Sequence, residues 1–146
     1  MSDLFRTDAQ ELAEDAQRLL IELDREVPGV AAVNAECRPA VDVLETSSSV
    51  EVLGDVPGVP PASLRVAMRR STLLIVGAKL AAPTDPSARF HLAERTYGRF
   101  ARAVRLSGAF DTRGARATTA AGQLRVVLPR IADRRGEVVA IPVETP

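Results

Sequence analysis

Between Gly122 and Pro129, Leu124, Val126 and Leu128 recur at a period of two, and this pattern constrains the fold more than any other feature of the sequence. Successive side chains of an extended strand point to opposite faces, so these three share one face. Gly122 can adopt the positive φ of a tight turn, and Pro129 lacks the N–H needed to continue a ladder. The stretch therefore predicts a strand with one buried face.

Similar patterns recur through the middle of the chain. Leu64, Val66 and Met68 alternate with arginine and alanine, and the continuous apolar run at 73–76 is typical of a strand buried on both faces. Seven short strands separated by turns indicate an all-β, antiparallel β-sandwich. The predicted strands are 41–43 and 50–52, paired as a hairpin across the turn at 46–49, then 64–68, 73–76, 100–106, 115–120 and 122–129.

Residues 8–26 predict a helix, because the spacing of Thr7 to Gln10 is that of a capping box and apolar residues then fall on one stripe. Two roles remain open for this stripe. The helix packs on its own domain, or it is an arm whose stripe meets other subunits or non-native chains. The stripe is Leu12, Ala16, Leu19, Leu20, Leu23 and Val27.

Prolines and a change of period divide the chain into three parts. Residues 27–39 break the helix and predict a linker, so residues 1–38 form a helical arm with its linker, 39–130 the sandwich and 131–146 a C-terminal extension. The extension ends in the apolar Ile141-Pro142-Val143, which we interpret as a clip for a groove on another subunit. The alternative is a last strand of the same chain.

The connection between Lys79 and Arg99 is too long for a hairpin. Loops of this length are usually functional or disordered. Because residues 89–94 form a strand-like patch inside it, we expect the connection to leave the sandwich and pair elsewhere. Arg102 has the parity of Phe100 and Val104, so it is expected on an apolar face, where it needs a carboxylate or carbonyl partner.

Composition argues against several classes of partner. Nineteen basic and 19 acidic residues balance, so no global field favours nucleic acid or anionic lipid. The N-terminal residues lack the basic and apolar regions of a signal peptide, and no apolar run approaches the ~20 residues of a membrane span. With a single cysteine, a reducing compartment fits best. We expect a cytoplasmic protein with neither nucleic acid nor membrane as partner.

No catalytic or metal-binding constellation is evident. His91 and Cys37 are each unique, so a metal site or proton relay lacks its second member. No phosphate-binding glycine-rich loop is present, and neither a cofactor nor an ATP-driven mechanism is expected. Cys37 lies in the linker, where it is a spectator thiol or, alternatively, forms a regulated intersubunit disulfide. An enzyme is therefore not expected.

Five blocks, in this order and spacing, resemble the small heat-shock protein, or α-crystallin, family over about Pro39 to Val143. The resemblance implies an immunoglobulin-like sandwich, the α-crystallin domain, in agreement with the predicted strands. The blocks are P-A-V-D-V-L-E-T at 39–46, D-V-P-G-V at 55–59, F-H-L-A-E-R-T-Y-G-R-F-A-R at 90–102, A-T-T-A-A-G-Q-L-R-V-V-L-P at 117–129 and I-P-V at 141–143.

The resemblance also implies roles for particular residues. The long loop would be exchanged between subunits and add to the partner's strand near 41–44, which makes a dimer; its residues are Arg89, Phe90, His91, Leu92, Glu94 and Arg95, with Arg102 in the same contact. The clip, Ile141, Pro142 and Val143, would dock in an edge groove formed by Leu64, Val66, Met68, Ala117 and Thr119. Client-binding residues of the arm would be Phe5, Leu12, Leu19, Leu20 and Leu23.

The activity that the resemblance implies is that of an ATP-independent holdase. Such a chaperone binds partly unfolded proteins and prevents their aggregation, and here it would work as a homodimer assembled into larger oligomers. The alternatives are an adaptor or co-chaperone, similar to a CS domain, that binds one folded partner, and a structural protein whose oligomer is the end product.

Overall fold

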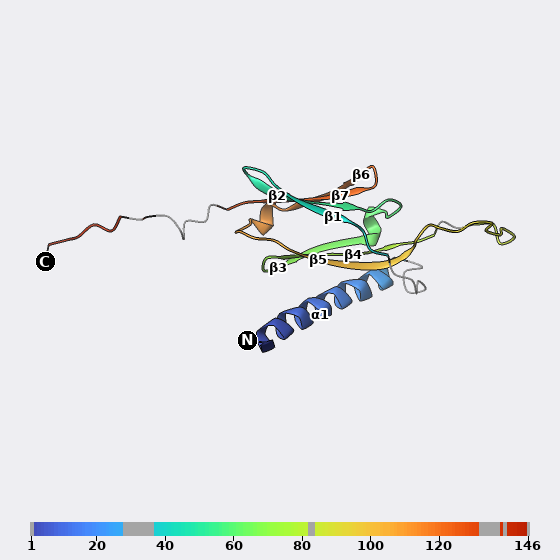
Figure 1. Cartoon of the computed structure of the whole chain (residues 1–146), viewed down its shortest axis with the longest axis horizontal. Helices are drawn as coiled ribbons and strands as arrows, with labels where there is room; N and C mark the ends of the chain where they lie inside the picture. The colour runs from blue at the N-terminus through green and yellow to red at the C-terminus, as the bar shows by residue number, and fades with distance from the viewer. Residues whose placement is uncertain (1, 28–36, 82–83, 132–137, 139, 146) are drawn as a thin grey trace.

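In the computed structural model, two antiparallel sheets face each other and a long helix, α1 (Ser2–Glu26), lies along the outside of one of them (Figure 1). The structure describes residues 2–27, 37–81, 84–131, 138 and 140–145. The sandwich predicted from the alternating pattern is confirmed. The helix forms a third layer, which the strand pattern did not predict.

The two sheets contain four and three strands. One has the order β1-β2-β7-β6 and the other the order β3-β4-β5. The edge strands are therefore β1 and β6 in the first sheet and β3 and β5 in the second. The strand bounds are β1 Val41–Glu45, β2 Ser49–Asp55, β3 Leu64–Arg69, β4 Thr72–Lys79, β5 Gly98–Arg105, β6 Arg116–Ala120 and β7 Gln123–Pro129.

The core lies between the sheets, as the period of two predicts. Leu124, Val126 and Leu128 of β7 are at most 2% exposed, and Val52 of the neighbouring β2 is fully buried. Gly122 has φ +76° in the tight turn between β6 and β7, in agreement with its expected role. The inner faces of both sheets contribute to one apolar cluster that holds the sandwich together.

Strand β4 is buried on both faces, and α1 is the reason. Leu73 and Ile75 point into the sandwich core, whereas Leu74 and Val76, at the alternate positions, point outward and are still at most 2% exposed. Leu23 of the helix is fully buried and packs with β4 in a separate cluster. Of the two roles left open for the helical stripe, packing on its own domain is what this chain shows.

Several boundaries differ from those predicted. The helix begins at Ser2 rather than residue 8, and the strand expected at 100–106 spans Gly98–Arg105. Two short 3₁₀ helices, η1 (Pro61–Ser63) and η2 (Thr112–Gly114), were not predicted. Residues 84–97 contain no strand and extend away from the sandwich, as expected of the long loop (Figure 1).

Candidate assembly and client-binding surfaces

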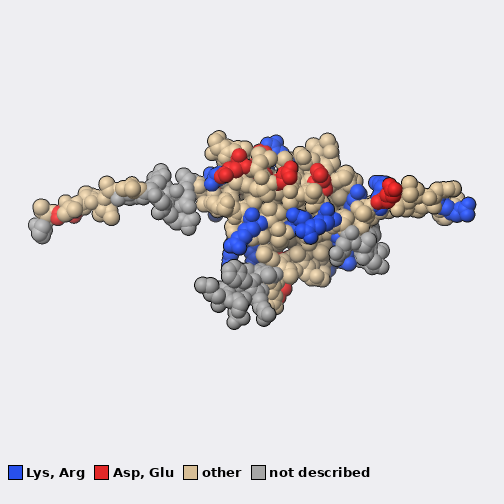
Figure 2. Space-filling view, in the orientation of Figure 1, with Lys and Arg blue, Asp and Glu red and all other residues tan. Residues whose placement is uncertain are grey.

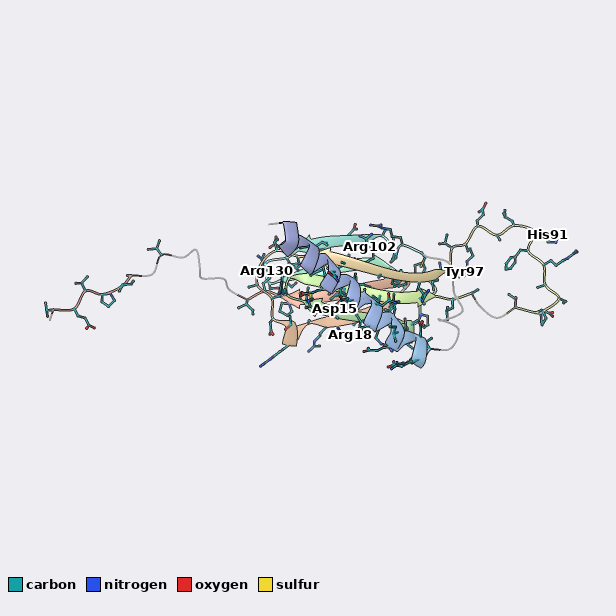
Figure 3. All side chains as sticks on the ribbon, turned by 90° about the horizontal axis from the view of Figure 1, so that it is seen from below. Asp15, Arg18, His91, Tyr97, Arg102 and Arg130 are labelled. Carbon is teal, nitrogen blue, oxygen red and sulfur yellow. The ribbon has the colours of Figure 1, made fainter. Side chains whose placement is uncertain are left out.

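The predicted dimer loop presents apolar side chains to solvent, well away from the rest of the chain. Phe90 and Leu92 are 79% and 74% exposed. His91 lies between them and far from the sandwich in Figure 3. Arg89, Glu94 and Arg95 are also exposed. Large apolar side chains on an isolated extended segment have no partner within their own chain, so their burial requires a second molecule.

At the base of this loop two cationic side chains lie close to one aromatic ring. The Lys79 Nζ atom lies 5.8 Å from the centroid of the Tyr97 ring, and the Arg95 guanidinium carbon lies 5.2 Å from it. Farther out, the Ser87 hydroxyl and backbone N–H both donate to the Asp85 carboxylate, which lowers the pKa of Asp85. The loop thus has local structure at its base and at its far turn.

The edge strands β1 and β5 carry the other residues of the predicted dimer contact. Val43 and Leu44 of the edge strand β1 are 50% and 37% exposed. On β5, an edge strand of the second sheet, Arg102 is half-buried and lies between the buried Phe100 and Val104, as its parity predicted. Within the described residues no carboxylate lies within ion-pair distance of Arg102. Among the described residues this guanidinium therefore has no ion-pair partner.

Charge is unevenly distributed over the molecular surface. Figure 2 shows basic side chains gathered across the middle of one face, with acidic side chains above them toward the four-stranded sheet. The chain as a whole is neutral. Local rather than net charge therefore decides which surfaces attract one another.

The residues predicted to form the groove for the clip lie on the edge strands β3 and β6. Val66 and Met68 of β3 pack against the core from the edge, and Leu64 is 8% exposed. On β6, Ala117 and Thr119 pair with the core residues Val126 and Leu124 of β7, but at this sheet edge Ala117 is exposed and Thr119 is half-buried. An open hollow of about 410 Å³ lies between the β6 turn and the segment ahead of β3; it is lined by Thr119 to Gly122 and by Val56 and residues 58–60. Sequence reasoning did not identify this hollow.

The C-terminal extension leaves the sandwich (Figure 1), and its apolar side chains are exposed. Ile141 and Val143 are 85% and 98% exposed. The start of the extension is fixed, because Arg130 forms an ion pair with Glu45 and the Ile131 N–H donates to the carbonyl of Ala109 at 2.9 Å. The predicted clip is therefore not a last strand of its own sandwich.

The residues predicted to bind clients on the arm differ in their exposure. Leu23 is fully buried, whereas Leu12, Leu19 and Leu20 are only half-buried against the sheet. Ile21, which was not among the predicted residues, is 42% exposed. The side chain of Phe5 lies outside the described residues. In this chain the stripe is mostly in contact with its own domain.

Ion pairs fasten α1 to the sheet beneath it. Arg69 of β3 contacts the Asp15 carboxylate at 2.6 Å and the Glu11 carboxylate at 2.9 Å, and hydrogen bonding to Asp15 raises the pKa of Arg69. Arg65 pairs with Glu26 at the other end of the helix. The helix crosses the strands obliquely in Figure 3, where Asp15 is labelled on it. These partners are too far apart in the sequence for periodicity to have paired them.

The remaining sequence predictions concern metal ligands, membrane spans and Cys37. Among the residues that the structure describes, no three His, Cys, Asp or Glu side chains gather as metal ligands, and no helix is long and apolar enough to cross a membrane. The Cys37 thiol donates to the Gly98 carbonyl at 3.3 Å. Partial burial raises the pKa of Cys37, and the nearby charge of Lys79 opposes the shift.

Sequence comparisons agree with this architecture. The model of the Hsp20/alpha crystallin family matches residues 42–144. The chain is 31% identical over 114 residues to the 18.9 kDa heat shock protein of Oryza sativa subsp. japonica, a match that covers 77% of this chain and 64% of the rice protein. It is 30% identical over 116 residues to the 18 kDa heat shock protein of Streptomyces albus G, covering 77% and 80%. The chain thus spans less than two thirds of its rice relative.

Solved structures lead to the same family. Heat shock protein 16.0 from Schizosaccharomyces pombe has a TM-score of 0.64 and 25% identity, covering 73% of this chain and all of that chain. A small heat-shock protein from Xylella fastidiosa has a TM-score of 0.62 and 28% identity, covering 75% and 100%. The strand order, the exposed loop and tail, and these matches together show that this chain belongs to the Hsp20/alpha crystallin family of small heat-shock proteins, which supports a chaperone role.

Proposed function

We propose that this chain is an ATP-independent holdase that works as a dimer-based oligomer. One observation carries the proposal: apolar side chains on two extended segments, the loop with Phe90 and Leu92 and the tail with Ile141 and Val143, are 74–98% exposed beside a sandwich with open strand edges. Exposed apolar segments and open edges are the features that join chains. When contacts between subunits open, the same segments and edges bind partly unfolded chains.

The dimer contact is the exchanged loop. Residues 89–94 add to the β1 edge of a second copy and satisfy backbone groups that are otherwise open to aggregation. Burial of Phe90 and Leu92 against the exposed Val43 and Leu44 adds an apolar contribution. Arg102, which has no ion-pair partner among the described residues, receives a carboxylate from the loop of the second copy.

The oligomer contact is the clip. Ile141 and Val143 dock in the groove between β3 and β6 of a neighbouring chain, and Pro142 lowers the ordering cost because its φ is fixed. Burial of each apolar residue contributes about 1.5–3 kcal/mol. One such contact is reversible, whereas contacts repeated around an assembly are firm. Heat or dilution releases clips and uncovers the groove for clients.

The test combines light scattering with an aggregation assay on a heat-labile client, without ATP. The variant pair is Ile141→Ser with Val143→Ser, compared with Val138→Ser as the matched control, because Val138 is fully exposed but lies outside the I-P-V motif. We expect the wild-type chain and the control to form large particles that suppress aggregation, and the double variant to fall to dimers. A wild-type dimer that protects no client would instead indicate an adaptor for one folded partner.

A further inference from the structure

Strand β5 concentrates arginine side chains at the edge of its sheet. Arg99, Arg102 and Arg105 lie at every third position of this edge strand. Arg38 lies beside the same strand, because the N–H of its neighbour Cys37 donates to the Arg99 carbonyl at 3.2 Å. The chain as a whole is neutral, so this edge has a local excess of positive charge.

Two clefts that are open to solvent run along β5 beside α1. The larger, of about 470 Å³, is lined by one side of the helix and by residues 99–103 of β5. The smaller, of about 210 Å³, is lined by Arg105 and the turn between β3 and β4, and it shares Ala103 with the larger. In Figure 3, Arg102 is labelled beside the helix. We call the two clefts together the β5 trough; its strand side is about 20 Å long.

The β5 trough combines apolar surface with positive charge. Ala101 and Ala103 of β5 are exposed in it, and Ile21 of α1, on the facing side, is 42% exposed. Six arginines line the two clefts, whereas two carboxylates do, those of Asp24 and Glu11. The trough therefore suits a ligand that has both negative charge and apolar groups.

The backbone of β5 favours a ligand in an extended conformation. Ala101 and Arg102 point to opposite faces of the sheet, yet both line the larger cleft, so this cleft includes the open edge of the strand. An edge strand presents N–H and C=O groups that can pair with another extended chain. The bond from Cys37 to Arg99 shows that one end of this edge already receives a backbone N–H. The edge is long enough for a segment of about six residues.

We propose that the β5 trough binds extended acidic segments of partly unfolded proteins. This inference rests on the holdase role proposed above and adds the chemical class of the client segment. The backbone of the segment pairs with the β5 edge, its carboxylates pair with the arginines, and its apolar side chains contact Ala103 and Ile21. Arg38, Arg99 and Arg105 take no part in the proposed loop and clip contacts, so the trough binds clients without release of either contact.

The test measures fluorescence polarisation of labelled eight-residue peptides mixed with the full chain. One peptide alternates glutamate and valine, and the other has glutamine in place of every glutamate. An exposed ion pair is worth up to about fivefold in a binding constant. We therefore expect the wild-type chain to bind the glutamate peptide at least about fivefold more tightly, and Arg38→Gln with Arg105→Gln to lose most of this preference.

The matched control is Arg113→Gln with Arg116→Gln, which removes the same charge from exposed positions outside the two clefts. This control should keep the preference for glutamate. Equal binding of the two peptides by the wild-type chain, or an equal loss in both double variants, would overturn the proposal.

Two further measurements separate the edge contact and the holdase role. N-methylation of alternate residues removes the N–H groups from one side of an extended peptide, so one of the two possible methylated peptides should lose binding and the other keep it. Equal binding of both would overturn pairing with the edge. In the aggregation assay without ATP, protection by a chain that shows no peptide preference would overturn the acidic site alone. A preference without protection of any client would overturn the holdase role and, with it, client binding in the trough.

Discussion

Replacement of Leu23 by alanine should detach α1 without unfolding the sandwich. Leu23 is fully buried and belongs to a small cluster with Ala78, separate from the sandwich core. The substitution removes three carbons beyond Cβ, and at about 0.8 kcal/mol per buried methylene this costs about 2.4 kcal/mol. Since 1.4 kcal/mol is tenfold in an equilibrium constant, the detached state gains roughly fifty-fold in population.

Hydrogen exchange followed by mass spectrometry measures both parts of this prediction. Amides of α1 should exchange roughly fifty-fold faster, while those of β2 and β7 keep their rates. The matched control is Ile21→Ala, since Ile21 is on the same helix but 42% exposed and its loss should have a smaller effect. Equal effects of the two substitutions, or a parallel loss of protection in β7, would refute the separation of the helix contact from the core.

Three further predictions follow from individual sites. Gly77→Ala should lower the free energy of unfolding by about 1–3 kcal/mol in urea titrations, because an added Cβ would lie 2.6 Å from Phe100 Cζ. Gly54→Ala is the control and should lower it less, because the atom nearest to a Cβ added there is 3.6 Å away. Burial raises the pKa of Cys37, so the folded chain binds the thiol proton more tightly than the unfolded chain does. The free energy of unfolding should therefore fall as the pH rises above the usual thiol pKa of about 8.5. Denaturant titrations of Cys37→Ala should lack this pH dependence, and the same dependence in that variant would contradict its assignment to Cys37. Arg102→Ala should leave the chain folded by circular dichroism but weaken dimerisation in sedimentation experiments, and unchanged dimer affinity would remove Arg102 from the contact.

The strands were predictable because each is a local pattern. Leu124, Val126 and Leu128 alternate and all three are buried, so the period of two located β7 and its inner face directly. The continuous apolar run in β4 predicted a strand buried on both faces, but it did not predict that α1 covers the second face. Nothing in residues 73–76 says that the second cover is a helix rather than another sheet.

Features that depend on distant residues were not predictable. Arg69 pairs with acids 54 and 58 positions away, and no sequence period reports such a pair. The helix start was misplaced for a different reason. The capping-box spacing at Thr7 to Gln10 is a local signal, and residues 2–7 contain no glycine or proline to stop a helix that continues through it. Contacts between chains stay predictions, since one chain alone cannot show them.

The loop and the tail leave opposite ends of the sandwich, as Figure 1 shows. When two chains exchange their loops with each other, the contact is isologous, so it joins two subunits and no more. A contact between the tail of one chain and the groove of another is heterologous, because it joins two different surface patches. Such contacts can link one pair to the next until rotation closes a ring or shell. If both proposed contacts form, the particle is built from pairs and is expected to contain an even number of chains.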